Sequence, residues 1–176
     1  MSVNRGKSFE QVIKDSFLKI PNVSVVRLPD PTQGYLGIRN ISDFIVYKYP
    51  YQYFIECKSV HGSTLPFSNI TDNQWQGMLE MSKIKGVVAG VICWWIDEDV
   101  TRFIPIEDLQ NLRDTGFKSV HYDSNVMHRK YGKFEKDFTS AVELFDGIVD
   151  IKGHKKRVFF DYDMDLFFHA IEKRLR

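Results

Sequence analysis

The sequence has little of what marks several common classes of protein. It holds only two cysteines, Cys57 and Cys93, and each lies inside an apolar run, which is typical of a buried thiol and indicates neither a disulfide nor a zinc site. No apolar run approaches the roughly 20 residues that a membrane-spanning helix needs. Residues 1–14 are too polar and charged for a signal peptide. We therefore expect a cytoplasmic protein without a membrane partner.

The sequence also lacks an excess of positive or negative charge. The net charge is +1, from 24 basic and 23 acidic residues, so the overall charge does not indicate a nucleic-acid binder. No glycine-rich phosphate loop or dinucleotide fingerprint is present, which argues against nucleotide-cofactor enzymes. Basic residues do cluster locally, and each cluster is either solvated surface or a contact to DNA phosphates. The candidates for DNA binding are Arg5, Lys7, Lys155, Lys156 and Arg157.

The apolar content is sufficient for one globular domain spanning residues 1–176, since 43% of the residues are hydrophobic and 14% are aromatic. Apolar periodicity predicts an α/β or α+β domain. We expect helices at 4–20, 73–84, 105–113 and 164–175, and strands at 23–28, 41–47, 52–59, 87–96, 101–104 and 157–160. Residues 61–69 have the composition of a loop, and 87–96 is apolar enough for a central strand buried on both faces.

The most informative stretch is a predicted hairpin around Tyr49 and Pro50. Asp43 lies six residues before Tyr49 and Glu56 six residues after Pro50, so a hairpin centred there places the two carboxylates opposite each other on one face. Lys58 joins them, because side chains two residues apart on a strand share a face. The alternative is an ordinary solvent-facing pair formed by Glu56 and Lys58.

Two carboxylates held close together repel each other unless a cation neutralises them, and a hard divalent ion such as Mg²⁺ suits that position. The lysine can orient an attacking water or neutralise charge on a phosphate. A third acid, Glu10, lies at the border of the apolar stripe of the first helix, where it faces the edge of the sheet or is an ordinary surface residue. The pattern therefore predicts a metal-dependent phosphodiesterase centre.

Five pieces of the sequence also occur in a characteristic order: Asn4-Arg5-Gly6-Lys7-Ser8-Phe9-Glu10, Ser42-Asp43-Phe44, Glu56-Cys57-Lys58, Leu65-Pro66-Phe67 and Gln74. Together they resemble RecU-type Holliday junction resolvases of the PD-(D/E)XK nuclease superfamily. The likeness runs from Asn4 to about Ile106. It implies a mixed β-sheet flanked by helices, a homodimer, and metal-dependent nicking of paired strands at a four-way DNA junction. There is one departure from the family. Its bacterial members carry a long insertion before the aspartate strand, whereas here only residues 29–42 occupy that place.

The resemblance also implies roles for individual residues. Asp43 and Glu56 would be ligands of Mg²⁺, with Mn²⁺ able to substitute, and the backbone carbonyl of Cys57 would complete the metal site. Lys58 would be the catalytic lysine. Glu10 would match the accessory acid of the first helix, Gln74 a glutamine near the active site, and Arg5 and Lys7 a basic arm on the DNA backbone.

Two other functions remain open at this point. One is a nuclease for linear or branched duplex, which would use the same chemistry. The other is a non-catalytic DNA-binding recombination protein, which the complete set of two acids and a lysine disfavours. The C-terminal part of the chain has more phenylalanines than one closing helix and one strand need for their own packing. The extra rings lie either at a dimer surface or in the core, and the candidates are Phe159, Phe160, Phe167 and Phe168.

Overall fold

The computed structural model describes residues 5–29, 40–123, 126, 147–155 and 160–175. Its helices are α1 (Arg5–Phe17), the 3₁₀ helix η1 (Phe67–Asn69), α2 (Asp72–Ser82), α3 (Ile106–Asp114) and α6 (Met164–Leu175). Its strands are β1 (Ser24–Arg27), β2 (Phe44–Lys48), β3 (Tyr51–Val60), β4 (Thr64–Pro66), β5 (Val87–Trp95), β6 (Val100–Pro105), β7 (Ser119–His121), β8 (Val149–Asp150), β9 (Gly153–Lys155) and β10 (Phe160–Tyr162). None of these helices is long and apolar enough to cross a membrane.

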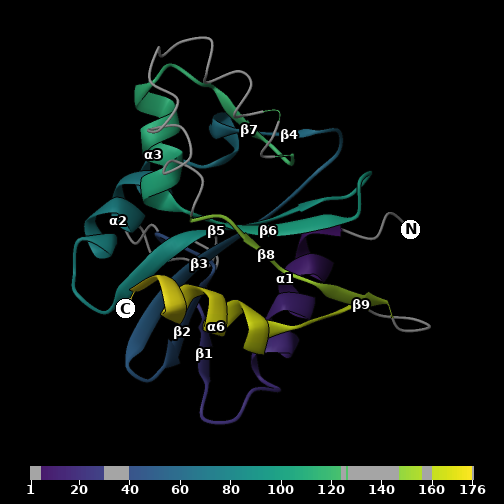
Figure 1. The fold of residues 1–176 in the computed structure, drawn as a ribbon, viewed down its shortest axis with the longest axis vertical. Helices are drawn as coiled ribbons and strands as arrows, with labels where there is room; N and C mark the ends of the chain where they lie inside the picture. The colour runs from purple at the N-terminus through teal and green to yellow at the C-terminus, as the bar shows by residue number, and fades with distance from the viewer. Residues whose placement is uncertain (1–4, 30–39, 124–125, 127–146, 156–159, 176) are drawn as a thin grey trace.

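A six-stranded sheet in the order β1-β2-β3-β5-β6-β8 forms the centre of the fold. Strands β3 and β5 run parallel, and all other neighbours in this sheet are antiparallel. Helices α2 and α3 lie on one face and α1 and α6 on the other, each pair over its own apolar cluster (Figure 1). The expected fold class, a mixed sheet flanked by helices, is confirmed.

The sequence pattern explains why these elements form where they do. In α1, Phe9, Ile13 and Phe17 recur every fourth residue, and all three are buried against the sheet. Strand β5 is apolar on both faces because it lies at the centre of the sheet between β3 and β6. The buried residues Val91 and Ile92 accordingly belong to opposite core clusters.

Three expectations need correction or fall outside the described residues. Residues 61–69 are not simply a loop, because β4 pairs with β7 and η1 follows it directly. Strand β2 begins at Phe44 and not at Ile41, since the segment before it turns toward α2. Residues 156–159, with the predicted strand start and the basic residues Lys156 and Arg157, lie outside the described residues; the strand there begins at Phe160.

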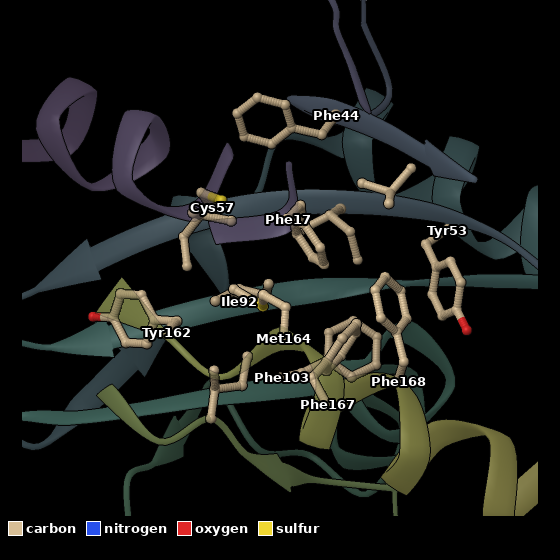
Figure 2. Close-up of a cluster of buried hydrophobic side chains, with 14 of the residues drawn as sticks. Phe17, Phe44, Tyr53, Cys57, Ile92, Phe103, Tyr162, Met164, Phe167 and Phe168 are labelled. Carbon is tan, nitrogen blue, oxygen red and sulfur yellow. The ribbon is translucent and has the colours of Figure 1, made fainter. Parts of the chain in front are cut away.

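The two phenylalanines of α6 belong to the core and not to a dimer surface. Figure 2 shows them among the aromatic side chains beneath α1, and both are fully buried. The ring centroid of Phe167 lies 5.8 Å from that of Phe17, 5.9 Å from that of Tyr53 and 5.3 Å from that of Phe103. The idea that Phe167 and Phe168 form an interface is therefore wrong. Phe159 lies outside the described residues, and for Phe160 only the backbone is described.

We expect Phe167→Ala to lower the free energy of unfolding by about 3 to 5 kcal/mol, because it removes a ring packed on three sides. The matched control is the neighbouring Leu166→Ala, which truncates a side chain that is 51% exposed and should cost less than about 1 kcal/mol. Urea denaturation followed by circular dichroism measures both. Equal losses for the two variants would contradict the packing described above.

Candidate active site

The β2–β3 hairpin brings Asp43 and Glu56 together. The last pair of the register is Phe44 with Ile55; Asp43 and Glu56 directly flank this pair, and the Asp43 carboxylate lies near enough to Glu56 to raise the pKa of that group. Asp43 lies just before β2, where its backbone N–H donates to the carbonyl of Ile55 at 3.1 Å and its own carbonyl accepts from the N–H of Leu28 at 2.8 Å. Backbone bonds on both sides therefore fix the position of this carboxylate.

Glu56 is unusual, because its carboxylate is charged at neutral pH in an ordinary setting and here is only 2% exposed. Its Oε1 accepts hydrogen bonds from Nε2 of Gln74 and from Nζ of Lys58, both at 2.7 Å. Its Oε2 is buried and has no hydrogen-bond partner within the described part of the chain. Burying a carboxylate oxygen without a partner is costly, so this atom marks a position for a cation or donor.

Burial and charge repulsion raise the pKa of both carboxyl groups. Burial raises the pKa of Glu56 to about 7, with the Asp43 carboxylate adding to the effect and Lys58 and Gln74 opposing it. The pKa of Asp43 is also raised by burial; the Cys57 N–H lowers it, Glu10 raises it, and Lys58 and Arg27 lower it. One lysine is thus insufficient to neutralise the pair.

Cys57 contributes its backbone to this site and its thiol to the core. The Cys57 N–H donates to Oδ2 of Asp43 at 2.8 Å, while the side chain is buried on the α1 face. In a strand, the N–H and C=O of one residue point toward the same edge. The Cys57 carbonyl is therefore directed to the side of β3 that Asp43 occupies, beyond the last β2–β3 pair.

Gln74 is held by two contacts that determine how its amide is turned. Thr71 caps α2 by accepting from the Gln74 N–H at 3.3 Å, and Oε1 of Gln74 accepts from the Thr71 N–H at 3.1 Å. Since the amide oxygen is used in this capping box, the amide NH₂ faces Glu56. Glutamine suits this position because it caps the helix and donates to a carboxylate at once.

Glu10 does not join the two carboxylates. Its Oε2 pairs with Nη2 of Arg27 at 3.0 Å on the α1 side of the sheet, near enough to Asp43 to raise the pKa of that group. Glu10 and Arg27 border a hollow of about 220 Å³, together with Gln11 and Phe44. The expectation that Glu10 faces the edge of the sheet agrees with this position. Arg27 was not among the predicted residues. The only indication in the sequence is that this cation lies on the same strand face as Val25.

Residues of this site fit a divalent cation, although they do not enclose one. The buried carboxylate of Glu56, which has one oxygen without a partner among the described residues, the half-buried carboxylate of Asp43 and a carbonyl at the same edge form a set of hard oxygen donors. Within the described residues, no three side chains of aspartate, glutamate, histidine or cysteine gather closely enough to hold a metal by themselves. The remaining ligands would come from the backbone, water and substrate.

Of the remaining predicted residues, the structure describes little beyond the backbone. Arg5 and Lys7 lie in the first turn of α1 and Lys155 in β9, and their side chains are outside what is described. Their role in DNA binding remains a prediction. Trp94 and Trp95 point to opposite faces as expected, with Trp94 against Phe9 and Trp95 in the α2 and α3 cluster.

Comparison with known proteins gives a likeness of fold. No protein-family model matches the sequence, and no curated protein sequence matches it either. Among solved structures, it is similar to the Holliday junction resolvase Hjc from Archaeoglobus fulgidus, with 16% sequence identity and a TM-score of 0.44 over 58% of this chain and 78% of that one. A likeness at this level does not carry a function from one protein to the other, and the RecU-type resemblance remains a prediction.

The segment before Asp43 is anchored to α2 at two points. Nδ2 of Asn73 donates to the carbonyl of Asn40 at 3.1 Å, and Ile41 packs directly on Gly77, where a Cβ would overlap its side chain. We expect Gly77→Ala to destabilise the protein by about 1 to 2 kcal/mol, because overpacking of about 1 to 3 kcal/mol exceeds the gain in helix propensity of about 1 kcal/mol. Urea denaturation measures the loss. The exposed neighbour Gln76→Ala is the control, and a Gly77→Ala protein more stable than wild type would contradict the contact.

The raised pKa of Glu56 predicts how stability depends on pH. The unfolded chain has the ordinary value of 4.5 and the folded protein about 7, so the folded state binds this proton more tightly. The contribution of Glu56 to the free energy of unfolding is therefore fully present below pH 4.5 and is lost as the pH rises through about 7. In EDTA, the free energy of unfolding of wild type minus that of Glu56→Gln should fall by on the order of 2 to 3 kcal/mol over that range.

The matched control for this pH series is Glu80→Gln, which removes an exposed carboxylate of α2. Its difference from wild type should stay flat, because an exposed carboxylate has nearly the same surroundings in both states. Guanidinium denaturation at several pH values gives the free energies. A flat difference for Glu56→Gln as well would show that the Glu56 carboxylate is not destabilised by its burial.

Proposed function

We propose that this protein is a divalent-metal-dependent DNA endonuclease whose centre consists of Asp43, Glu56 and Lys58. The observation that carries the proposal is the buried Glu56 carboxylate, which lies beside Asp43 and has one oxygen that no described residue bonds. A scaffold gains no stability from two carboxylates placed in this way. A purely DNA-binding role does not account for them either, because phosphate contacts need cations and not buried acids.

Each residue has a role in phosphodiester hydrolysis that follows from its position. Asp43, Glu56 and the Cys57 carbonyl would hold Mg²⁺, or Mn²⁺ in its place, which supplies Lewis acidity toward the phosphate and lowers the pKa of a bound water. Lys58 touches Glu56 and is 22% exposed, so its ammonium reaches both the carboxylates and an incoming substrate. It would orient the attacking water and neutralise charge that develops on the phosphate. Gln74 positions Glu56 through their hydrogen bond.

The substrate that we propose is a four-way DNA junction, which the protein would cut as a homodimer by two symmetric nicks, in DNA recombination and repair. This finer part rests on the RecU-type resemblance of the motifs and on symmetry. A junction has approximate two-fold symmetry, and two copies of the chain related by a two-fold axis address two equivalent phosphates in one encounter. A nuclease for linear or branched duplex is the alternative.

The proposal is tested with end-labelled four-way, three-way and linear DNA of matched sequence, in Mg²⁺, Mn²⁺ or EDTA. Asp43→Asn, Glu56→Gln and Lys58→Ala should each lower the cleavage rate about 100-fold or more, because each removes a group that acts on the reacting phosphate. Lys85→Ala is the control, since it removes an exposed cation in the turn that follows α2. Cleavage by wild type in EDTA would sink the proposal.

Metal binding needs a readout that does not depend on cleavage. Mg²⁺ should raise the melting temperature of wild type and of Lys58→Ala, whereas Asp43→Asn should lose that increase because the metal then binds the folded state weakly.

The homodimer is tested in the same preparations with mixtures of wild-type and Lys58→Ala subunits. Mixed dimers should nick one strand of a junction and rarely resolve it, and equal rates on linear duplex would favour the general nuclease.

A further inference from the structure

A second hollow, separate from the carboxylates, lies on the α2 and α3 side of the sheet. Its volume is about 700 Å³, it is open to solvent, and it is lined by η1 with the start of α2 on one side and by the end of α3 with the segment before β7 on the other. Its lining combines apolar, hydroxyl and charged side chains with one glycine: Phe67, Ser68, Ile70, Thr71, Asp72, Arg113, Gly116, Phe117 and Lys118.

Two cations border this hollow, and neither has a carboxylate partner within the part of the chain that the structure describes. The guanidinium of Arg113 lies 4.8 Å from the centre of the Trp75 ring, and Trp75 is itself held by a 2.6 Å hydrogen bond from its indole N–H to Gln110. Neither Arg113 nor Lys118 forms an ion pair with any of the described residues. A guanidinium that lies over an aromatic ring keeps its N–H donors available for an anion.

The floor of the hollow is apolar and partly aromatic. Phe67 and Ile70 are largely buried there, and Phe117 is half-buried at the rim. Flat apolar surfaces next to fixed cations are the features that bind a nucleotide outside a stack, because the base needs a surface to lie on and its phosphate needs a positive charge. Asp72 is the one acid of the lining, so a phosphate would enter from the Arg113 and Lys118 side.

Helix α2 connects this hollow to the carboxylates. Thr71 lines the hollow and caps α2, and its N–H is bonded to the same Gln74 amide that donates to Glu56. Gln74 therefore contacts both a lining residue of the hollow and the buried carboxylate, so the two features share the first turn of α2.

We propose that this hollow receives one unstacked nucleotide of the bound DNA, with its phosphate on Arg113 and Lys118 and its base against Phe67 and Phe117. This inference rests on the proposed nuclease function and adds a basis for substrate choice. Bases of an intact duplex are stacked and paired and do not reach such a floor, whereas a branch point or a single-stranded flank supplies unpaired bases at lower cost. The hollow would thus favour open DNA over linear duplex.

The experiment measures affinity without cleavage. Fluorescence anisotropy in Ca²⁺ follows binding of the full chain to a labelled immobile four-way junction, a single strand and a linear duplex of the same sequence. Arg113→Ala and Phe117→Ala should each weaken binding to the junction and the single strand by about tenfold, while binding to duplex changes less than twofold. Lys85→Ala is the matched control for loss of an exposed cation, and Phe117→Leu keeps the apolar volume without the ring.

A variant that fills the hollow guards against loss of folding. Ser68→Trp replaces an exposed lining residue and should block the nucleotide while the melting temperature stays near that of wild type. With 2-aminopurine beside the branch, emission should rise when wild type binds and stay low with Ser68→Trp.

The possible results separate this inference from the function on which it rests. Equal losses on all three DNAs would make Arg113 an ordinary backbone contact and overturn the nucleotide site. Unchanged affinities in every variant, with cleavage by wild type intact, would overturn this inference alone. No binding or cleavage by wild type would overturn the proposed function and the inference together.

Discussion

The arrangement of the whole site depends on the burial of one carboxylate. Glu56 is 2% exposed, shares its surroundings with Asp43, and has one oxygen without a partner among residues 5–29, 40–123, 126, 147–155 and 160–175. Such a group is tolerated only because Lys58 and Gln74 bond its other oxygen and because strand β3 is fixed on both sides, by β2 and by β5. The raised pKa expresses the same cost, and an added cation would remove it.

Helix α2 organises this side of the sheet. Through Gln74 it orients Glu56, through Asn73 and Gly77 it holds the segment that leads into Asp43, and through Thr71 it borders the larger hollow. These contacts come from one helix that is anchored in the core by Trp75 and Met78. The position of α2 therefore affects both carboxylates, Glu56 through a direct hydrogen bond and Asp43 through the segment that precedes it.

Much of the fold followed from local patterns in the sequence. The bounds of α6, the central position of β5 and the closeness of Asp43 and Glu56 all result from periodicity or from a short turn, which act over a few residues. The pairing of β4 with β7 did not follow, because two strands of three residues each, more than 50 positions apart, carry too little pattern of their own.

The site was predictable to the extent that its residues share the hairpin. Glu56, Lys58 and Asp43 lie on adjacent strands, so alternation was sufficient to gather them. The contact of Arg27 with Glu10 depends instead on how α1 sits against β1, and no spacing encodes that distance. Gln74 was expected near the site only by resemblance, and its bond to Glu56 depends on a capping box that turns the amide.

The two faces of the sheet divide stability and chemistry between them. On the α1 and α6 face, the aromatic cluster of Phe17, Tyr53, Phe103, Phe167 and Phe168 is closely packed and fully buried (Figure 2). On the other face, β3 carries Glu56, whose burial is unfavourable, and the partly exposed Lys58, which bonds it. Because side chains alternate along β3, Ile55 and Cys57 pack into the aromatic side, while Glu56 between them faces α2. A single strand thus supplies both the packing that offsets the cost of the carboxylate and the carboxylate itself.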